Sequence, residues 1–231
     1  MVDPYREKGY TGYREMWCHP LQLGTSRLSL EQMWICAERA QVDFRGWPFL
    51  FISRNRPDCT YALQDGLETL IPFKDFSKQD RVDFWRFHQS LFFYQRTLMW
   101  EESYARKHQV EPVMDVTALE MYAAEGIHCL TKLYENVLAP SDEVFVSFRI
   151  TNTEDRLLQI LDPAPIPLRM NYRSRIPEIR YEKVLPLADW RAGLIDHAVD
   201  VCKHVFERFN WPDPNLLGSR KKIERMLSRT F

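Results

Sequence analysis

A regular pattern over residues 143–151, in which every second residue is apolar, constrains the fold more than any other feature of this sequence. Successive side chains of a β-strand point to opposite faces, so every second residue shares a face. The residues that would share the apolar face are Val144, Val146, Phe148 and Ile150. A strand with one apolar face buries that face and leaves the other toward solvent. The segment therefore predicts a half-buried strand of an antiparallel sheet.

Other strand-like segments cluster in two regions of the chain, 49–73 and 143–187. The segments are 49–53, 59–63, 67–73, 156–161 and 178–187. The dipeptide Asp65-Gly66 lies between two of them and is a strong hairpin signal, because both residues tolerate the positive φ of a tight turn. Helical patterns lie between and around the two regions. This segregation predicts an α+β fold, with an antiparallel sheet flanked by four or five helices in a single domain.

Helical periodicity begins at Ser29, which forms a capping box with Gln32. Further helices are predicted over 77–108, 117–138, 189–209 and 219–228. The longest, 77–108, is apolar nearly all round, which is typical of a central helix or of one shared with a partner. We expect residues 1–28 to form an irregular N-terminal arm, 29–213 the α+β domain, and 214–231 a basic helix packed on it.

Composition and charge exclude several classes of protein. The formal net charge of −1 argues against a general nucleic-acid binder, which would carry a basic excess, although a local patch stays possible. Five cysteines, an odd number without a CxxC pair, indicate reduced thiols and a cytoplasmic location. The N-terminus has no signal-peptide pattern, and no apolar run is long enough to cross a membrane. Neither a phosphate loop nor a metal-ligand spacing occurs, so no cofactor or metal is predicted.

Two groups of residues are candidates for nuclease chemistry. Asp58, Asp65 and Glu68 lie around the predicted hairpin and would hold a divalent cation in a metal-dependent nuclease. Arg81 and His88 are seven residues apart, which places them on nearly one face of the predicted helix. Their spacing resembles the Arg-x(4–6)-His pattern of HEPN ribonucleases, in which the pair engages the scissile phosphate.

Two other clusters are candidates for binding. Arg45 and Trp47 lie in the segment RGWPF between a helix and a strand, where a guanidinium can stack on an aromatic ring. The second cluster surrounds the proline-rich loop and comprises Arg169, Tyr172, Arg173 and Arg175. Such a basic and aromatic surface could contact an acidic partner or single-stranded nucleic acid.

The segments RGWPFLFI (45–52), FWRFHQSLFFYQRTLMWEE (84–102) and VLPLADWRAGLIDHAVDVCKHVFERFNWPD (184–213) carry a resemblance. In this order they resemble the uncharacterised C-terminal region of bacterial proteins that begin with a Schlafen/AlbA-like DNA-binding module. The resemblance covers roughly residues 29–213 and does not extend to the N-terminal module of those proteins. It implies a bacterial protein of a kind suspected of roles in phage defence, and it carries over no catalytic residue.

The many aromatic residues without a catalytic motif favour a non-enzymatic binding or assembly module. Its expected partner is another protein or a second copy, bound through the aromatic helix 78–107 or the corner 45–49. The alternatives are a nuclease and a small-ligand sensor with a pocket between sheet and helices.

Overall fold

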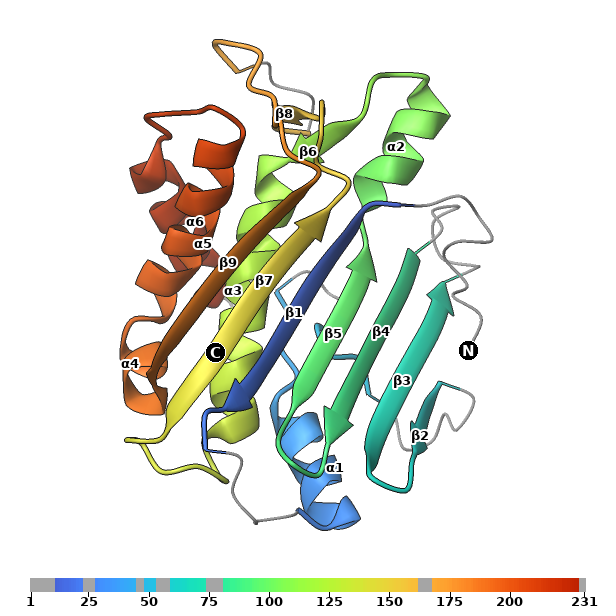
Figure 1. Ribbon diagram of the computed structural model, residues 1–231, viewed down its shortest axis with the longest axis vertical. Coiled ribbons are helices and arrows are strands. Elements are labelled where there is room, and N and C mark those ends of the chain that lie inside the picture. The colour runs from blue at the N-terminus through green and yellow to red at the C-terminus, as the bar shows by residue number, and fades with distance from the viewer. Residues whose placement is uncertain are drawn as a thin grey trace.

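A seven-stranded antiparallel sheet, with its helices on one side, forms the body of the computed structural model (Figure 1). The structure describes residues 11–22, 28–44, 48–52, 59–73, 81–161 and 168–228. These residues form one α+β domain, which confirms the predicted fold class. Six helices lie within them, against the four or five expected.

The strands of the sheet follow the order β2-β3-β4-β5-β1-β7-β9, and every neighbouring pair is antiparallel. Their bounds are Thr60–Ala62 (β2), Gly66–Phe73 (β3), Arg81–His88 (β4), Phe93–Leu98 (β5), Tyr13–Pro20 (β1), Glu143–Thr151 (β7) and Glu178–Pro186 (β9). Two short strands, β6 (Val113–Asp115) and β8 (Leu157–Gln159), form a separate parallel pair. The alternating segment 143–151 is thus confirmed as a strand. A hairpin joins β2 to β3 as expected, but Gly66 is the first residue of β3 and the turn precedes it.

The helices are α1 (Leu30–Arg39), α2 (Trp100–His108), α3 (Val116–Tyr134), α4 (Leu187–Ala192), α5 (Leu194–Arg208) and α6 (Leu216–Leu227). In Figure 1, α1, α3, α5 and α6 lie behind the sheet. None of the described helices is both long and apolar enough to cross a membrane. The basic C-terminal helix α6 buries Ile223 and packs on α5 and α3.

Helix α3 lies against the sheet along most of its length and organises the core. Asp115 caps it by accepting hydrogen bonds from the N–H groups of Thr117 and Ala118, so the helix begins just before the Thr117 expected from the sequence. Gly126 allows a close approach to the sheet, because a Cβ there would lie 2.7 Å from Sδ of Met16 and 2.8 Å from the ring of Phe148. The capping box of Ser29 and Gln32 on α1 is present as predicted.

The prediction of one long helix over 77–108 is wrong. Residues 81–98 form the hairpin β4–β5, and only Trp100–His108 is helical. Aromatic side chains occupy both faces of these strands, which hides the period of two. The connecting turn uses Leu91 at φ +67° where a glycine would have marked it.

Other corrections concern the chain ends and short segments. The irregular arm expected over 1–28 is wrong for Tyr13–Pro20, which is strand β1 and pairs with both β5 and β7. Residues 49–52 form only an isolated bridge between Phe49 and Val42, and residue 53 lies outside the described part. Of the strand-like segment 156–161, only Leu157–Gln159 forms a strand, and it pairs with β6 outside the main sheet. The single helix expected over 189–209 is divided, because α4 ends at Ala192 and α5 begins at Leu194.

Candidate functional site

The front of the sheet is the face that none of the described helices crosses in Figure 1. Part of this face is buried, since Glu15, Glu68 and Ser147 are at most 2% exposed. The strand registers place its outward side chains in three rows that run across the strands, and we call these rows together the open face. The apolar row is Phe92, His19, Phe145 and Val184; the middle row is Glu68, Arg86, Tyr94, Trp17, Ser147 and Glu182; the charged row is Leu70, Phe84, Arg96, Glu15, Arg149 and Arg180.

The apolar row is continuous across the β4–β5 turn and three strands. The ring of His19 stacks on Phe92 and on Phe145, with centroids 6.2 Å and 5.1 Å apart. Phe145 pairs in turn with Val184 on the edge strand β9. Phe92 and Val184 are 37% and 38% exposed. Outward positions on an uncovered sheet are normally polar, so exposed apolar side chains in one row indicate a contact surface.

The turn that carries Phe92 is held firmly. Leu91 has φ +67°, a left-handed conformation that is costly for a bulky side chain and persists only where the surroundings enforce it. Its side chain is buried, and the buried hydroxyl of Tyr134 donates a 2.6 Å hydrogen bond to its carbonyl oxygen. The core therefore fixes the position of Phe92, which lowers the entropy that a contact through this ring would lose.

A hollow of about 490 Å³ lies beside Phe92 at the β4–β5 end of the apolar row. Its lining comprises His19, Arg86, His88, Ser90 and Phe92. The volume falls within the ~300–1,000 Å³ usual for ligand pockets, but this hollow is shallow and open to solvent. A shallow apolar hollow suits a protruding side chain of a protein partner better than an enclosed small molecule.

Ion pairs neutralise the arginines of the open face. The buried carboxylate of Glu15 accepts hydrogen bonds from Arg149 and from the hydroxyl of Tyr94, and it lies 3.5 Å from Arg96. Burial and the contact with Glu15 raise the pKa of Tyr94 well above its ordinary value, so the phenol stays protonated. Arg180 pairs with Glu178 at 2.9 Å. Each of these guanidinium groups therefore has a carboxylate partner within the chain, and the face offers little net positive charge.

The structure brings three predicted candidates together at the edge of this face. His88 Nε2 lies 3.2 Å from Asp65, Arg86 binds both carboxylate oxygens of Asp65 at 2.9 and 3.1 Å, and Arg86 lies 3.9 Å from Glu68. Tyr61 donates a 2.7 Å hydrogen bond to Glu68. Burial and this bond raise the pKa of Tyr61 to about 12. Partial desolvation raises the pKa of the Asp65 carboxyl. The nearby Arg86 and His88 outweigh this effect and lower that pKa below its usual value.

This cluster ties two turns together and lacks the features of a reaction centre. The N–H of Ser90 donates to His88 Nδ1 at 3.0 Å, so Nε2 carries the proton that faces Asp65. The Ser90 hydroxyl lies 2.7 Å from the same Nδ1 and shares that acceptor with the backbone. Asp65 is already neutralised by Arg86. Among the described residues, no group of three or more His, Cys, Asp or Glu side chains is placed to hold a metal ion.

The other predicted site residues are scattered. Arg81 and His88 are the first and last residues of β4, about 23 Å apart along an extended strand, so they cannot act as the pair expected on a helix. Arg45, Trp47 and Asp58 lie outside the described residues.

The predicted basic and aromatic surface around the proline-rich loop is only partly present. Tyr172 stacks on Trp211 at 5.2 Å, Arg173 pairs with Glu111, and Arg175 pairs with Asp155 at 3.2 Å. Arg169 lies with Tyr172 and Trp211 along a wide surface groove. Partners within the chain therefore satisfy the aromatic ring and two of the arginines.

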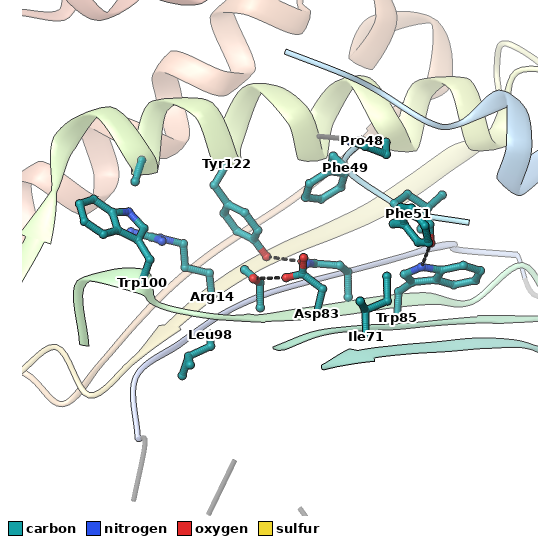
Figure 2. A pocket seen from close by; sticks show the side chains of 14 residues that line it. Arg14, Pro48, Phe49, Phe51, Ile71, Asp83, Trp85, Leu98, Trp100 and Tyr122 are labelled. Atoms are coloured by element: carbon teal, nitrogen blue, oxygen red, sulfur yellow. Dashed lines mark hydrogen bonds between the residues drawn. The ribbon is translucent and has the colours of Figure 1, made fainter. Parts of the chain in front are cut away.

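A second cavity lies between the sheet and α3 (Figure 2). Tyr122 points into it from the helix and donates a 2.8 Å hydrogen bond to Gln95, while Thr97 donates to Asp83 on the sheet. Phe49, the last residue of the predicted RGWPF segment, and Phe51 line one side of the cavity. Its volume of about 50 Å³ holds a few water molecules and is several-fold below that of a ligand pocket. The cavity does not have room for the ligand of a small-molecule sensor.

Sequence reasoning missed the residues that make the open face, above all Trp17, His19, Phe145 and Val184. One signal for two of them was present. Phe145 and Val184 are apolar residues at outward positions of β7 and β9, where a half-buried strand normally carries polar ones.

No family model, no curated protein and no solved structure matches this chain. The resemblance to the C-terminal region of Schlafen/AlbA-like proteins stays a prediction.

Proposed function

We propose that this protein is a non-enzymatic binding module that holds a protein partner on the open face of its sheet. The observation that carries the proposal is the apolar row, with Phe92 and Val184 exposed on a rigid antiparallel sheet. Binding energy at protein interfaces concentrates in a few well-held aromatic or aliphatic side chains. The fixed turn at Leu91 and the hollow beside Phe92 supply such a centre, and the ion-paired rows supply a polar rim.

The charges of the open face support a protein partner over nucleic acid. Nucleic-acid affinity comes mainly from cations that neutralise phosphates. Here Arg86, Arg149 and Arg180 all lie within 4 Å of a carboxylate of the same chain. A surface of this kind has aromatic rings for stacking but lacks the positive field that attracts a polyanion.

The alternatives have weaker support. The metal-dependent nuclease needs Asp65 and Glu68 to be available, and both are engaged by Arg86 or Tyr61. The HEPN-like pair is separated by the length of β4. A role as a subunit of a cytoplasmic bacterial assembly, of the phage-defence type suggested by the resemblance, agrees with the five buried cysteines, none of which forms a disulfide.

Affinity purification from a native lysate tests the proposal. The tagged full chain is compared with Phe92→Glu, which places a charge in the apolar row, and with Met170→Glu, a control at a 67% exposed residue outside the open face. We expect the wild type and the control to retain the same protein in stoichiometric amount, and Phe92→Glu to lose it. An untagged copy of this chain counts as such a partner. Equal retention by all three folded proteins would place the binding surface elsewhere and refute the proposal.

A further inference from the structure

The order of the strands makes the open face self-complementary. We propose, on the basis of the proposed function, that the protein partner is a second copy of this chain, packed face to face about a two-fold axis that runs along β1. Closed two-fold dimers are the commonest protein oligomers, and their interfaces use the same patch on both subunits. Strand β1 is the middle one of the five strands β4-β5-β1-β7-β9, so the axis places β4 opposite β9 and β5 opposite β7 of the second copy, and β2 and β3 lie beyond the contact.

The apolar row matches itself under this symmetry. The hollow lies at its β4–β5 end and the exposed Val184 lies at its β9 end. A two-fold axis along β1 exchanges the two ends, so Val184 of each copy lies over the hollow of the other. Phe92 then faces Phe145 of the second copy, and His19 lies on the axis facing its equivalent. One symmetric contact thereby buries the apolar row of both copies.

The middle row supplies opposite charges at matching positions. Arg86 occupies this row on β4 and Glu182 occupies it on β9. The axis places each Arg86 opposite Glu182 of the second copy, while Trp17 meets its equivalent on the axis. Glu182 is 44% exposed as a side chain and Arg86 is 39% exposed, so both can be reached from the second copy. Each already has a partner within its own chain, since Glu182 lies 3.7 Å from Arg180 and Arg86 lies 2.9 Å from Asp65, so the contact between copies extends these ion pairs.

The charged row contributes one favourable and one unfavourable contact. Phe84 on β4 lies opposite Arg180 on β9, which suits a cation–π contact. Arg96 lies opposite Arg149 of the second copy, but Glu15 of each chain already binds both of its own arginines and reduces their repulsion. The row therefore sets the orientation and adds little to the affinity.

The size of the face indicates a weak to moderate dimer. Five strands about 4.8 Å apart and three rows about 6.7 Å apart, with a margin for side chains, cover roughly 500 Å² per copy. A total of roughly 1,000 Å² is at the lower limit for a specific interface. We therefore expect a dissociation constant in the micromolar range, which concentration-dependent sedimentation resolves.

Analytical ultracentrifugation of the full chain tests the proposal with a charge-swap cycle. Within one chain, residues 86 and 182 are four strand spacings apart, about 19 Å, so they do not contact each other and their effects should be additive. Glu182→Arg and Arg86→Glu each place like charges across the axis, and we expect each to weaken the dimer by about tenfold or more. The double variant restores opposite charges and should return to within about threefold of the wild type. Val184→Glu should abolish dimerisation, and Met170→Arg should leave it unchanged.

The outcomes separate this proposal from the proposed function. A dimer that tolerates both Glu182→Arg and Val184→Glu uses another surface, which overturns the two-fold arrangement. A wild type that stays monomeric up to about 200 µM, well above a micromolar constant, also overturns it. In that case, a different protein that is retained from lysate and lost with Phe92→Glu still supports the proposed function. Thermal unfolding of each variant identifies any that fail to fold, and Glu182→Arg at the exposed edge strand keeps the cycle testable if Arg86→Glu is unstable.

Discussion

The imidazole of His128 should make the fold less stable in acid. His128 lies on α3 against Phe44, and its Nδ1 is buried without a hydrogen-bond partner among the described residues. Burial, with a smaller contribution from the positive charge of Lys132, lowers its pKa from 6.5 to about 4. The native state therefore binds a proton on this ring more weakly than the unfolded chain does.

The direction and size of the effect follow from that difference. Because the pKa of the native state is lowered, the contribution of His128 to stability is fully present above pH 6.5. It is lost progressively as the pH falls from 6.5 to about 4. Each pKa unit corresponds to about 1.4 kcal/mol, so the loss approaches about 3 kcal/mol at the lower end. For a domain stabilised by about 5–15 kcal/mol, this is a large fraction.

Urea unfolding of the wild type and of His128→Gln, at about pH 7.5 and pH 4.5, measures the effect. Glutamine does not titrate, whereas His197 and His204, whose pKa values burial also lowers, are present in both proteins and cancel in the comparison. We expect the free energy of unfolding of the wild type to fall by about 2–3 kcal/mol more than that of the variant. Parallel losses in the two proteins would refute the reasoning, because they would show that His128 is not a buried neutral base.

Two further predictions concern the core. Gly126→Val should destabilise the fold by about 2 kcal/mol or more, because the valine side chain would meet Met16 and Phe148 where α3 lies close to the sheet. Thermal unfolding measures the loss, and an unchanged midpoint would contradict this packing. Glu101→Gln should cost about 3–5 kcal/mol in chemical unfolding, because it leaves the buried guanidinium of Arg14 without its counter-charge. The double variant Arg14→Met/Glu101→Leu should recover most of that loss, and no recovery would mean that the pair itself stabilises the fold.

Sequence patterns predicted the fold where each local rule agreed with the three-dimensional environment. Strand β7 has one buried face and one outward face, so the period of two in its apolar residues could be recognised in the sequence. The capping box at Ser29 and the turn before Gly66 close local hydrogen bonds that need no tertiary context. The sheet and the fold class followed from these elements.

The β4–β5 hairpin was not predictable in the same way. Trp85 and Phe87 face the core while Phe84 and Phe92 lie on the other side, so apolar residues occur on both faces and simulate an all-round apolar helix. Its turn contains Leu91 in a conformation that glycine normally marks. Sequence rules tend to fail where residues serve a purpose other than folding, and this failure falls on the open face.

The candidate site needed the tertiary structure. Glu15 and Trp17 come from β1, Arg86 from β4 and Arg149 from β7, and only the register of three strand pairs brings them together. Asp65 and His88 were candidates in two separate hypotheses, and the structure places them in one ion-paired cluster. No spacing in the sequence predicts contacts between residues as far apart as Glu15 and Arg149, which are separated by 134 positions.

Cross-linking at the open face tests the central claim most directly. All five native cysteines are buried, so a cysteine introduced at His19, on the proposed axis, would be the reactive thiol. Face-to-face sheets lie about 10 Å apart, a gap that a short bis-maleimide spans. The account predicts that His19→Cys forms a cross-linked species of twice the 27.6 kDa chain mass, while Met170→Cys, at an exposed residue elsewhere, stays monomeric. Equal cross-linking at both positions, or none at His19→Cys in a folded protein at high concentration, would contradict it.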